Sequence, residues 1–182
     1  MKIGITQRIL QHNKNSYDAI DQNWYRFLKD HEIVPIPNRL DQNFKELAIL
    51  LDRLIISGGD ETDLRVAVEK ELIKEMLRQC KPILGVCHGA FLLNELLGGQ
   101  NTICENHHNT FHHIVIDNDE HIVNSHHKLQ MKKTPLYVTE LATDLEGNCE
   151  SWIYKDMCAI VWHPERMENP VIPKKIIDVF FT

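Results

Sequence analysis

The sequence predicts an α/β protein whose mostly parallel sheet is wrapped by helices on both faces, with a small antiparallel extension in its C-terminal half. Up to about residue 112, short apolar runs alternate with amphipathic stretches, which is typical of a parallel sheet with crossover helices. After that point, short strand-like segments follow one another, separated by turn residues. The 182 residues, with 43% hydrophobic and 25% charged side chains, fit one globular domain over 1–182.

In the first half, each expected strand is a short apolar run and each expected helix has apolar residues three or four positions apart. Because every strand is followed by a helix, neighbouring strands should run in the same direction. We expect strands at Lys2–Thr6, Ile33–Pro37, Arg53–Ile56 and Ile83–Val86, and helices at 16–30, Phe44–Leu51, 65–79 and from about Gly89 onward.

In the second half, turn-forming stretches such as 117–120 and 146–148 separate the apolar segments, which favours antiparallel pairing. A final helix should begin at Ile172 and close the chain at Phe181. The expected strands are His113–Ile116, His121–Asn124, Leu136–Ala142, Ser151–Tyr154 and Ala159–Trp162.

The composition excludes several classes of function. A net charge of −6 argues against non-specific nucleic-acid binding, which needs a basic surface. We find no charged leader followed by an apolar segment and no apolar run near ~18 residues, so we expect a cytoplasmic protein without membrane contact. Five cysteines, an odd number without a Cys-x-x-Cys pair, indicate neither a disulfide framework nor a zinc ribbon.

Cys87 lies between two glycines at the point where a buried strand is expected to turn into a helix. Glycines at such a corner let the chain turn sharply, so that a nucleophile stands exposed at the top of the sheet. The positive end of the following helix dipole would favour the thiolate. An ordinary packed thiol after a strand fits the same short pattern, and the glycines alone do not decide between the two.

His163 and Glu165 end another predicted strand, in the sequence His-Pro-Glu. A cysteine nucleophile needs a base, and the base needs a group that orients it, so Cys87, His163 and Glu165 form a candidate catalytic triad. A third strand ends in Gly58-Gly59. Backbone N–H groups of these glycines, with that of His88, could form an oxyanion hole, but a plain Gly-Gly turn fits the motif when it stands alone.

In this order the three motifs resemble the class I glutamine amidotransferase-like family. The stretches 4–8, 35–37 and 124–127 are most similar to its γ-glutamyl hydrolase branch. The resemblance implies a three-layer, doubly wound, flavodoxin-like sheet and a γ-glutamyl thioester on Cys87, with no cofactor. His163 would then be the general acid/base and Glu165 its orienter, acting on a small-molecule γ-glutamyl substrate.

The resemblance also implies residues that contact this substrate: Gly58, Arg65, Phe91, Ser125 and His126. Glutaminase-type members commonly carry glutamine at the position of Phe91. We therefore expect poor activity on free glutamine and better activity on conjugates with a larger leaving group, such as γ-glutamyl amines or γ-glutamyl-CDP-amidate. Ring packing beneath Cys87 is the other explanation for Phe91.

Two further functions stay open at this level. The chain could be a glutaminase subunit that supplies ammonia to a separate synthase, or a non-catalytic binding module of the same fold. Arg65 and Glu69 could equally form a solvent-exposed ion pair one helical turn apart. The histidine pairs 107–108, 112–113 and 126–127 could suggest zinc, but adjacent side chains point in different directions, and we expect no metal site.

Overall fold

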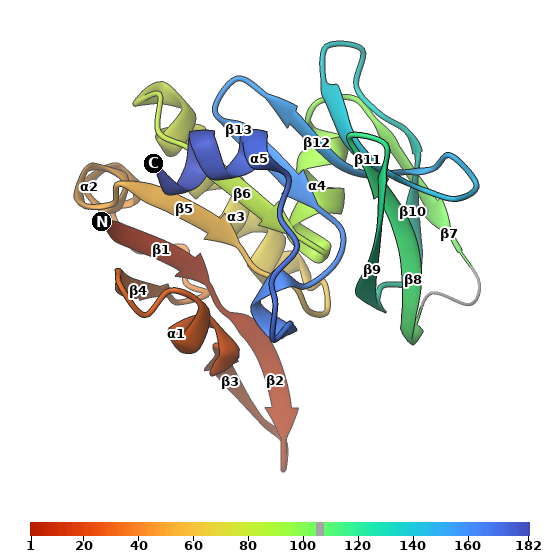
Figure 1. Cartoon of the computed structure of the whole chain (residues 1–182). Helices are drawn as coiled ribbons and strands as arrows, with labels where there is room; N and C mark the ends of the chain where they lie inside the picture. The colour runs from red at the N-terminus through yellow and green to blue at the C-terminus, as the bar shows by residue number, and fades with distance from the viewer. Residues whose placement is uncertain (105–107) are drawn as a thin grey trace.

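The computed structural model describes residues 1–104 and 108–182. Its central strands pair in the order β4 (Glu32–Ile36), β1 (Lys2–Thr6), β5 (Arg53–Ile56), β6 (Ile83–Val86) and β13 (Met157–Ile160), and all of these pairs are parallel. Renumbered along the chain, this is the 2-1-3-4-5 order of a doubly wound sheet, which confirms the predicted fold class (Figure 1). β6 and β13 are buried from end to end, and β5 is buried except at Arg53, as expected for strands covered on both faces.

Helices cover both faces of this sheet. α2 (Phe44–Leu50), α3 (Asp63–Arg78) and α4 (His88–Leu96) bury their apolar sides in one core cluster. α1 (Asn23–Phe27), α5 (Lys174–Ile176) and the π-helical turn η2 (Ile177–Phe181) contribute to a second cluster on the opposite face. The closing helix thus begins at Lys174 rather than Ile172, because Pro173 occupies its N-cap position.

The antiparallel extension is larger than the sequence indicated. β12 (Cys149–Tyr154) pairs with β13, and β11 (Thr139–Asp144), β8 (His108–Ile116) and β9 (Asp119–His126) continue the sheet from it. β7 (Gln100–Ile103) and β10 (Leu129–Lys133) pair with each other and were not predicted. Both are short and mix polar with apolar residues, so neither shows a strong strand pattern.

The helix predicted over 16–30 is wrong in its first half. There the chain forms the hairpin β2 (Arg8–His12) and β3 (Asn15–Ala19), which projects from the body of the molecule (Figure 1). Its two-residue turn, Asn13 and Lys14, has positive φ angles of 49° and 64°, the backbone of a tight hairpin. Tyr17 is 49% exposed, so its helix-like spacing from Ile20 and Trp24 does not reflect a buried helical face.

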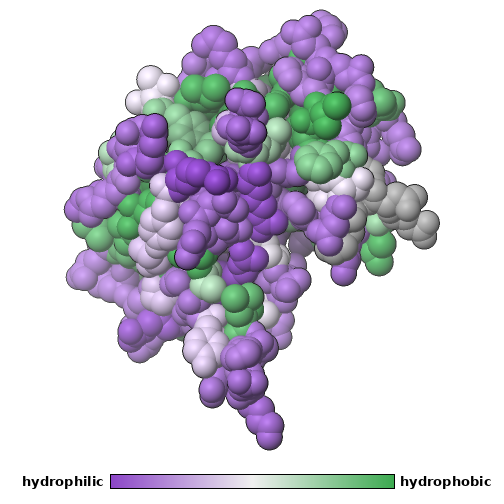
Figure 2. Space-filling view, turned by 60° about the horizontal axis from the view of Figure 1, so that its bottom comes forward, coloured by the Kyte–Doolittle hydropathy of each residue, from purple (hydrophilic) through white to green (hydrophobic). Residues whose placement is uncertain are grey.

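Within the described residues, no helix is long and apolar enough to cross a membrane. The carboxyl ends of β1, β5, β6 and β13 meet at one edge of the sheet, beside the hairpin and the tips of β8 and β9 (Figure 1). Seen toward this edge, the surface is mostly hydrophilic and is hollowed next to the projecting hairpin (Figure 2). Open α/β sheets bind their ligands at this edge.

Candidate active site

Cys87 occupies a strained corner between β6 and α4. Its φ of 52° and ψ of −105° are rarely adopted by a residue with a side chain, at a cost of roughly 1–3 kcal/mol. The flanking glycines are required for a reason other than the sharp turn expected from the sequence. A Cβ on Gly85 would lie 2.4 Å from the Gly89 carbonyl oxygen, and one on Gly89 would lie 2.2 Å from that of Ile56. The glycines therefore permit close packing of α4 on the sheet, and Cys87 itself adopts the unfavourable backbone.

His163 follows β13 and faces Cys87 across the edge of the sheet. Its Nδ1 lies 2.6 Å from Oε1 of Glu165, which the short 3₁₀ helix η1 (Pro164–Arg166) places two residues further on. Burial alone would lower the pKa of His163, but hydrogen bonds to Cys87 and Glu165, with the negative charge of both partners, raise it to about 9. Since Nδ1 is engaged by Glu165, Nε2 faces the thiol.

Asn124, at the inner end of β9, holds the backbone of His163 in place. Its side-chain amide donates to the His163 carbonyl oxygen at 2.8 Å and accepts from the His163 N–H at 2.8 Å. This two-point contact links the antiparallel extension to the reacting edge of the parallel sheet. The role was not predicted from the sequence. The sequence offered only an asparagine at the end of a predicted strand, within the stretch 124–127 that carries the family resemblance, and neither feature reveals its partner.

Gly58 and Gly59 follow β5 and lie against the same imidazole. A Cβ on Gly58 would be 2.3 Å from Cε1 of His163, so a side chain here would displace the ring. Gly59 has a φ of +124°, a conformation that favours glycine. The backbone N–H groups at the N-terminus of α4, including that of His88, have no acceptor within their own helix. Gly59 and His88, the residues of the predicted oxyanion hole, line the same cavity as Cys87.

A buried network fixes this loop, and its members contradict the solvent-exposed pair considered from the sequence. Arg65 and Glu69 are fully buried, with Arg65 Nε 2.8 Å from Glu69 Oε1. Arg65 also donates to the carbonyl oxygens of Ser57 and Asp60 in the loop after β5. The side chain of Arg65 thus holds the Gly-Gly loop from beneath.

Glu69 is the centre of this network. Its carboxylate accepts from Nε2 of His88 at 2.7 Å and from the Thr6 hydroxyl at 2.8 Å. Burial alone would raise the pKa of Glu69, but the His88 hydrogen bond, the nearby cationic charges and the Thr6 hydrogen bond hold it below its usual range. The carboxylate stays ionised and connects β1, α3 and the start of α4.

A cavity of about 360 Å³ opens over these groups. Among the predicted site residues, its walls include Gly59, Cys87, His88, Phe91, His126 and His163. Gly58, Arg65, Ser125 and Glu165 are not among the residues that line it; they are buried behind its walls. Phe91 is only 5% exposed, so its ring forms part of the wall and also packs into the core.

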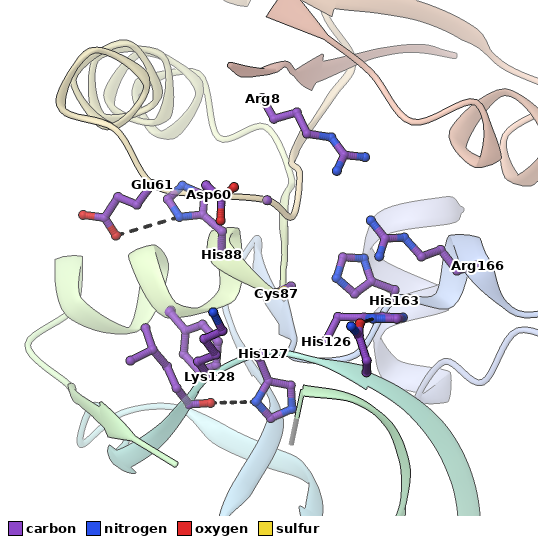
Figure 3. A pocket seen from close by; sticks show the side chains of 14 residues that line it. Arg8, Asp60, Glu61, Cys87, His88, His126, His127, Lys128, His163 and Arg166 are labelled. Atoms are coloured by element: carbon purple, nitrogen blue, oxygen red, sulfur yellow. Dashed lines mark hydrogen bonds and ion pairs between the residues drawn. The ribbon is translucent and has the colours of Figure 1, made fainter. Parts of the chain in front are cut away.

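Charged side chains of both signs surround the cavity. In Figure 3, Asp60 and Glu61 lie on one side of Cys87 and Arg166 lies on the other, with Arg8 above. Asp21 holds the two arginines at the rim, with its carboxylate 3.2 Å from Nη2 of Arg8 and 3.2 Å from Nε of Arg166. Arg166 was not predicted as a site residue, because a charge after a strand is usually a solvated surface residue.

Residues 12–181 match the family described as "Glutamine amidotransferase class-I". The chain belongs to this family. The resemblance drawn from the three motifs is thereby confirmed, and the protein is a class I glutamine amidotransferase-like protein. Over its full length it is 28% identical to gamma-glutamyl-CDP-amidate hydrolase of Campylobacter jejuni subsp. jejuni serotype O:2, of which 98% is covered.

A second relative of this amidotransferase-like chain is YvdE of Lactococcus lactis subsp. lactis, a candidate glutamine amidotransferase-like protein. It is 28% identical over 92% of this chain and 89% of its own length. Among solved structures, a candidate GMP synthase component from Thermoplasma acidophilum superposes with a TM-score of 0.73 at 20% identity, over 99% of this chain and 92% of that one. A glutamine amidotransferase from Thermotoga maritima superposes with a TM-score of 0.69 at 18% identity, over 90% of this chain and 76% of that one. The solved structures share the fold.

Proposed function

We propose that this protein hydrolyses the γ-glutamyl amide bond of a small molecule and releases L-glutamate together with an amine or amidate. The observation that carries this proposal is the line of contacts from Cys87 through His163 to Glu165 at the floor of the cavity. A raised imidazole pKa of about 9 keeps the ring of His163 protonated at neutral pH. The ring therefore carries the proton that the leaving nitrogen needs, and the sulfur of Cys87 beside it is the nucleophile that acyl transfer needs.

In the first half of the reaction, the Cys87 sulfur attacks the γ-carbonyl carbon. The oxyanion that forms accepts hydrogen bonds from the N–H groups of Gly59 and His88. The imidazolium of His163 then gives its Nε2 proton to the leaving nitrogen, the C–N bond breaks, and a γ-glutamyl thioester is left on Cys87. Glu165 stabilises the cationic ring until the proton has moved.

In the second half, neutral His163 takes a proton from a water molecule that attacks the thioester carbonyl. The tetrahedral intermediate collapses, the C–S bond breaks and glutamate leaves. Cys87 returns as a thiolate and His163 as an imidazolium, so the resting pair is restored without any external proton donor.

The charges of the cavity support a substrate that bears both signs. A γ-glutamyl group carries an ammonium and a carboxylate on its α-carbon, which suit Asp60 or Glu61 and the basic side chains respectively. Three basic side chains, Arg8, Lys128 and Arg166, line the cavity, and the two arginines share Asp21 as a partner. With the name of the full-length relative, this favours a leaving group that carries phosphate, and γ-glutamyl-CDP-amidate is our first candidate.

Three substrates test the proposal: γ-glutamyl-CDP-amidate, a chromogenic γ-glutamyl anilide and free glutamine. We expect kcat/KM to be highest for the amidate and lowest for glutamine, because the ring of Phe91 cannot replace the hydrogen bonds of a side-chain amide. A value for glutamine equal to the best conjugate would instead favour a protein that supplies ammonia to a synthase. No turnover of any substrate, with Cys87 inert to iodoacetamide, would favour a binding module.

A further inference from the structure

A second cluster of ionisable side chains lies in the antiparallel extension, apart from the triad. His112 comes from β8, His127 follows β9 directly, and Glu150 comes from β12. Glu150 is 1% exposed, His127 is also buried, and His112 is partly buried. One nitrogen from each ring and one carboxylate oxygen all lie within 4.8 Å of one another.

The distances in this cluster fit the coordination sphere of a small cation. Nε2 of His112 lies 3.4 Å from Oε2 of Glu150, and Nε2 of His127 lies 3.9 Å from the same oxygen. Ligands at about 2.0–2.1 Å from a tetrahedral Zn²⁺ are separated from each other by roughly 3.3 Å. The two distances to Glu150 are therefore close to this value, and the two ring nitrogens lie within 4.8 Å of each other.

The hydrogen bonding of His127 prepares its ring for this role. Its Nδ1 donates to the carbonyl oxygen of Leu129 at 2.7 Å (dashed in Figure 3), which fixes the tautomer and turns the lone pair of Nε2 toward Glu150. Metal-bound imidazoles commonly donate their second N–H to a backbone carbonyl in this way. The rings of His112 and His127 meet edge to face, at 87°, so their nitrogens approach Glu150 from different directions.

A cysteine also lies next to this cluster. Cys104 itself lies 3.9 Å from Nδ1 of His127, the ring nitrogen that points away from Glu150, and is therefore not counted as a ligand.

We propose that His112, His127 and Glu150 bind one Zn²⁺ ion as a two-histidine, one-carboxylate site, with the fourth position of the tetrahedron open. His127 also lines the active-site cavity, and its ring centroid lies 5.9 Å from that of Phe91. The ion would therefore tie β8, β12 and the chain after β9 into a rigid cavity wall. This proposal replaces the expectation of no metal, which rested on the differing directions of adjacent histidines.

The side chains of two histidines adjacent in the sequence do point in different directions. Strand pairing, however, brings together histidines that belong to two different dipeptides. His113 points away from His112 and contacts Glu120 at the surface, 2.5 Å from it. The strand pairing places one member of each of two pairs, His112 and His127, beside Glu150. His107, a member of the remaining pair, lies outside the described residues.

The test uses the full-length Cys87→Ala protein, so that the catalytic thiol cannot bind the added metal. After dialysis against a chelator, the protein is titrated with Co²⁺ and Zn²⁺ at pH 7.5, and bound metal is measured by mass spectrometry. We expect one equivalent of metal, visible d–d absorption of tetrahedral Co²⁺, and a raised melting temperature with Zn²⁺. His112→Ala and Glu150→Gln should each weaken binding at least tenfold, whereas the neighbouring control His113→Ala should leave it unchanged.

Two results would overturn the proposal. If the chelated parent protein binds no metal and its melting temperature does not respond to Zn²⁺, the cluster is only a buried ion pair of imidazole and carboxylate. An intense thiolate-to-cobalt band that disappears in Cys104→Ser would assign the metal to a different set of ligands. Because both measurements are made on chains that retain His112 and Glu150, they do not depend on the folding of those variants. They are also independent of turnover, so the proposed hydrolase activity can stand or fall separately.

Discussion

The site contains two buried histidine–carboxylate pairs that look alike and differ in which ring nitrogen they engage. Glu165 holds His163 by Nδ1 at 2.6 Å, whereas Glu69 holds His88 by Nε2 at 2.7 Å. The first arrangement leaves Nε2 directed at Cys87, where a proton can move. The second leaves Nδ1 of His88 facing Glu61 at 4.0 Å, away from the thiol. The position of the second ring nitrogen, rather than the hydrogen bond to the carboxylate, thus distinguishes the proposed catalytic histidine, His163, from His88.

The carboxylates of the two pairs differ as well. Glu69 accepts from Arg65 and Thr6 in addition to His88, so it is the junction of a network that holds backbone. Besides His163, Glu165 has Arg166 at 3.6 Å. We therefore expect changes at Glu69 to affect stability and loop geometry, and changes at Glu165 to affect mainly the protonation of the reacting ring.

The largest expected effect comes from the reacting pair itself. Cys87→Ala and His163→Asn should each lower kcat by about 10⁴-fold or more, because the groups of a triad act as a unit. Steady-state kinetics on the best γ-glutamyl conjugate measure this effect. Cys80→Ala, at an exposed cysteine, is the matched control and should retain full activity. Loss of activity in Cys104→Ala or Cys158→Ala with an active Cys87→Ala would refute the assignment.

Glu69→Gln tests the structural pair. It removes the charge that balances buried Arg65, so we expect the free energy of unfolding to fall by about 3 kcal/mol. The loosened Gly-Gly loop should also lower kcat by roughly 10²-fold, as expected for loss of an oxyanion-hole contact. Urea unfolding and kinetics measure the two effects. The surface pair variant Glu71→Gln, on the same helix, is the control, and an equal loss of stability there would count against the network.

Glu165→Gln should change mainly the pH dependence of kcat. With the pKa of His163 near 9, kcat should fall as pH rises through about 9, because the ring loses the proton that the leaving group needs. Without the carboxylate, that alkaline limb should move toward lower pH. The raised pKa also stabilises the folded protein, fully below pH 6.5 and progressively less as pH rises through 9. An alkaline limb that stays at the same pH in Glu165→Gln would contradict the proposed role.

Asn124→Ala should have the smallest effect of the series. The amide holds the backbone of His163, so its loss should displace the ring slightly and lower kcat by about tenfold with KM little changed. Asn118→Ala, in the exposed turn before the same strand, is the control for kcat. If KM rises while kcat stays constant, Asn124 contacts the substrate instead.

The parallel half of the molecule could be predicted because its strands are buried on both faces and therefore appear as continuous apolar runs. Cys87, His163 and Glu165 could be predicted as a candidate triad because each lies at or just after the end of such a run. The β2–β3 hairpin was missed because Tyr17 and Ile20 mimic a helical spacing while Asn13-Lys14 is an uncommon turn pair. The burial of Arg65 and Glu69, and the contact of Asn124, depend on long-range packing that no local pattern encodes.

The positive φ of Cys87 lowers the stability of the folded protein in exchange for a side chain at this corner. A glycine at position 87 would adopt the same corner without strain, so Cys87→Gly should be inactive and yet lose less stability than Cys87→Ala, or gain some. Selection for stability alone would therefore remove the nucleophile. A side chain at this strained corner therefore fits the proposed role of Cys87, and conformational strain at one residue coincides with the place where the proposed chemistry occurs.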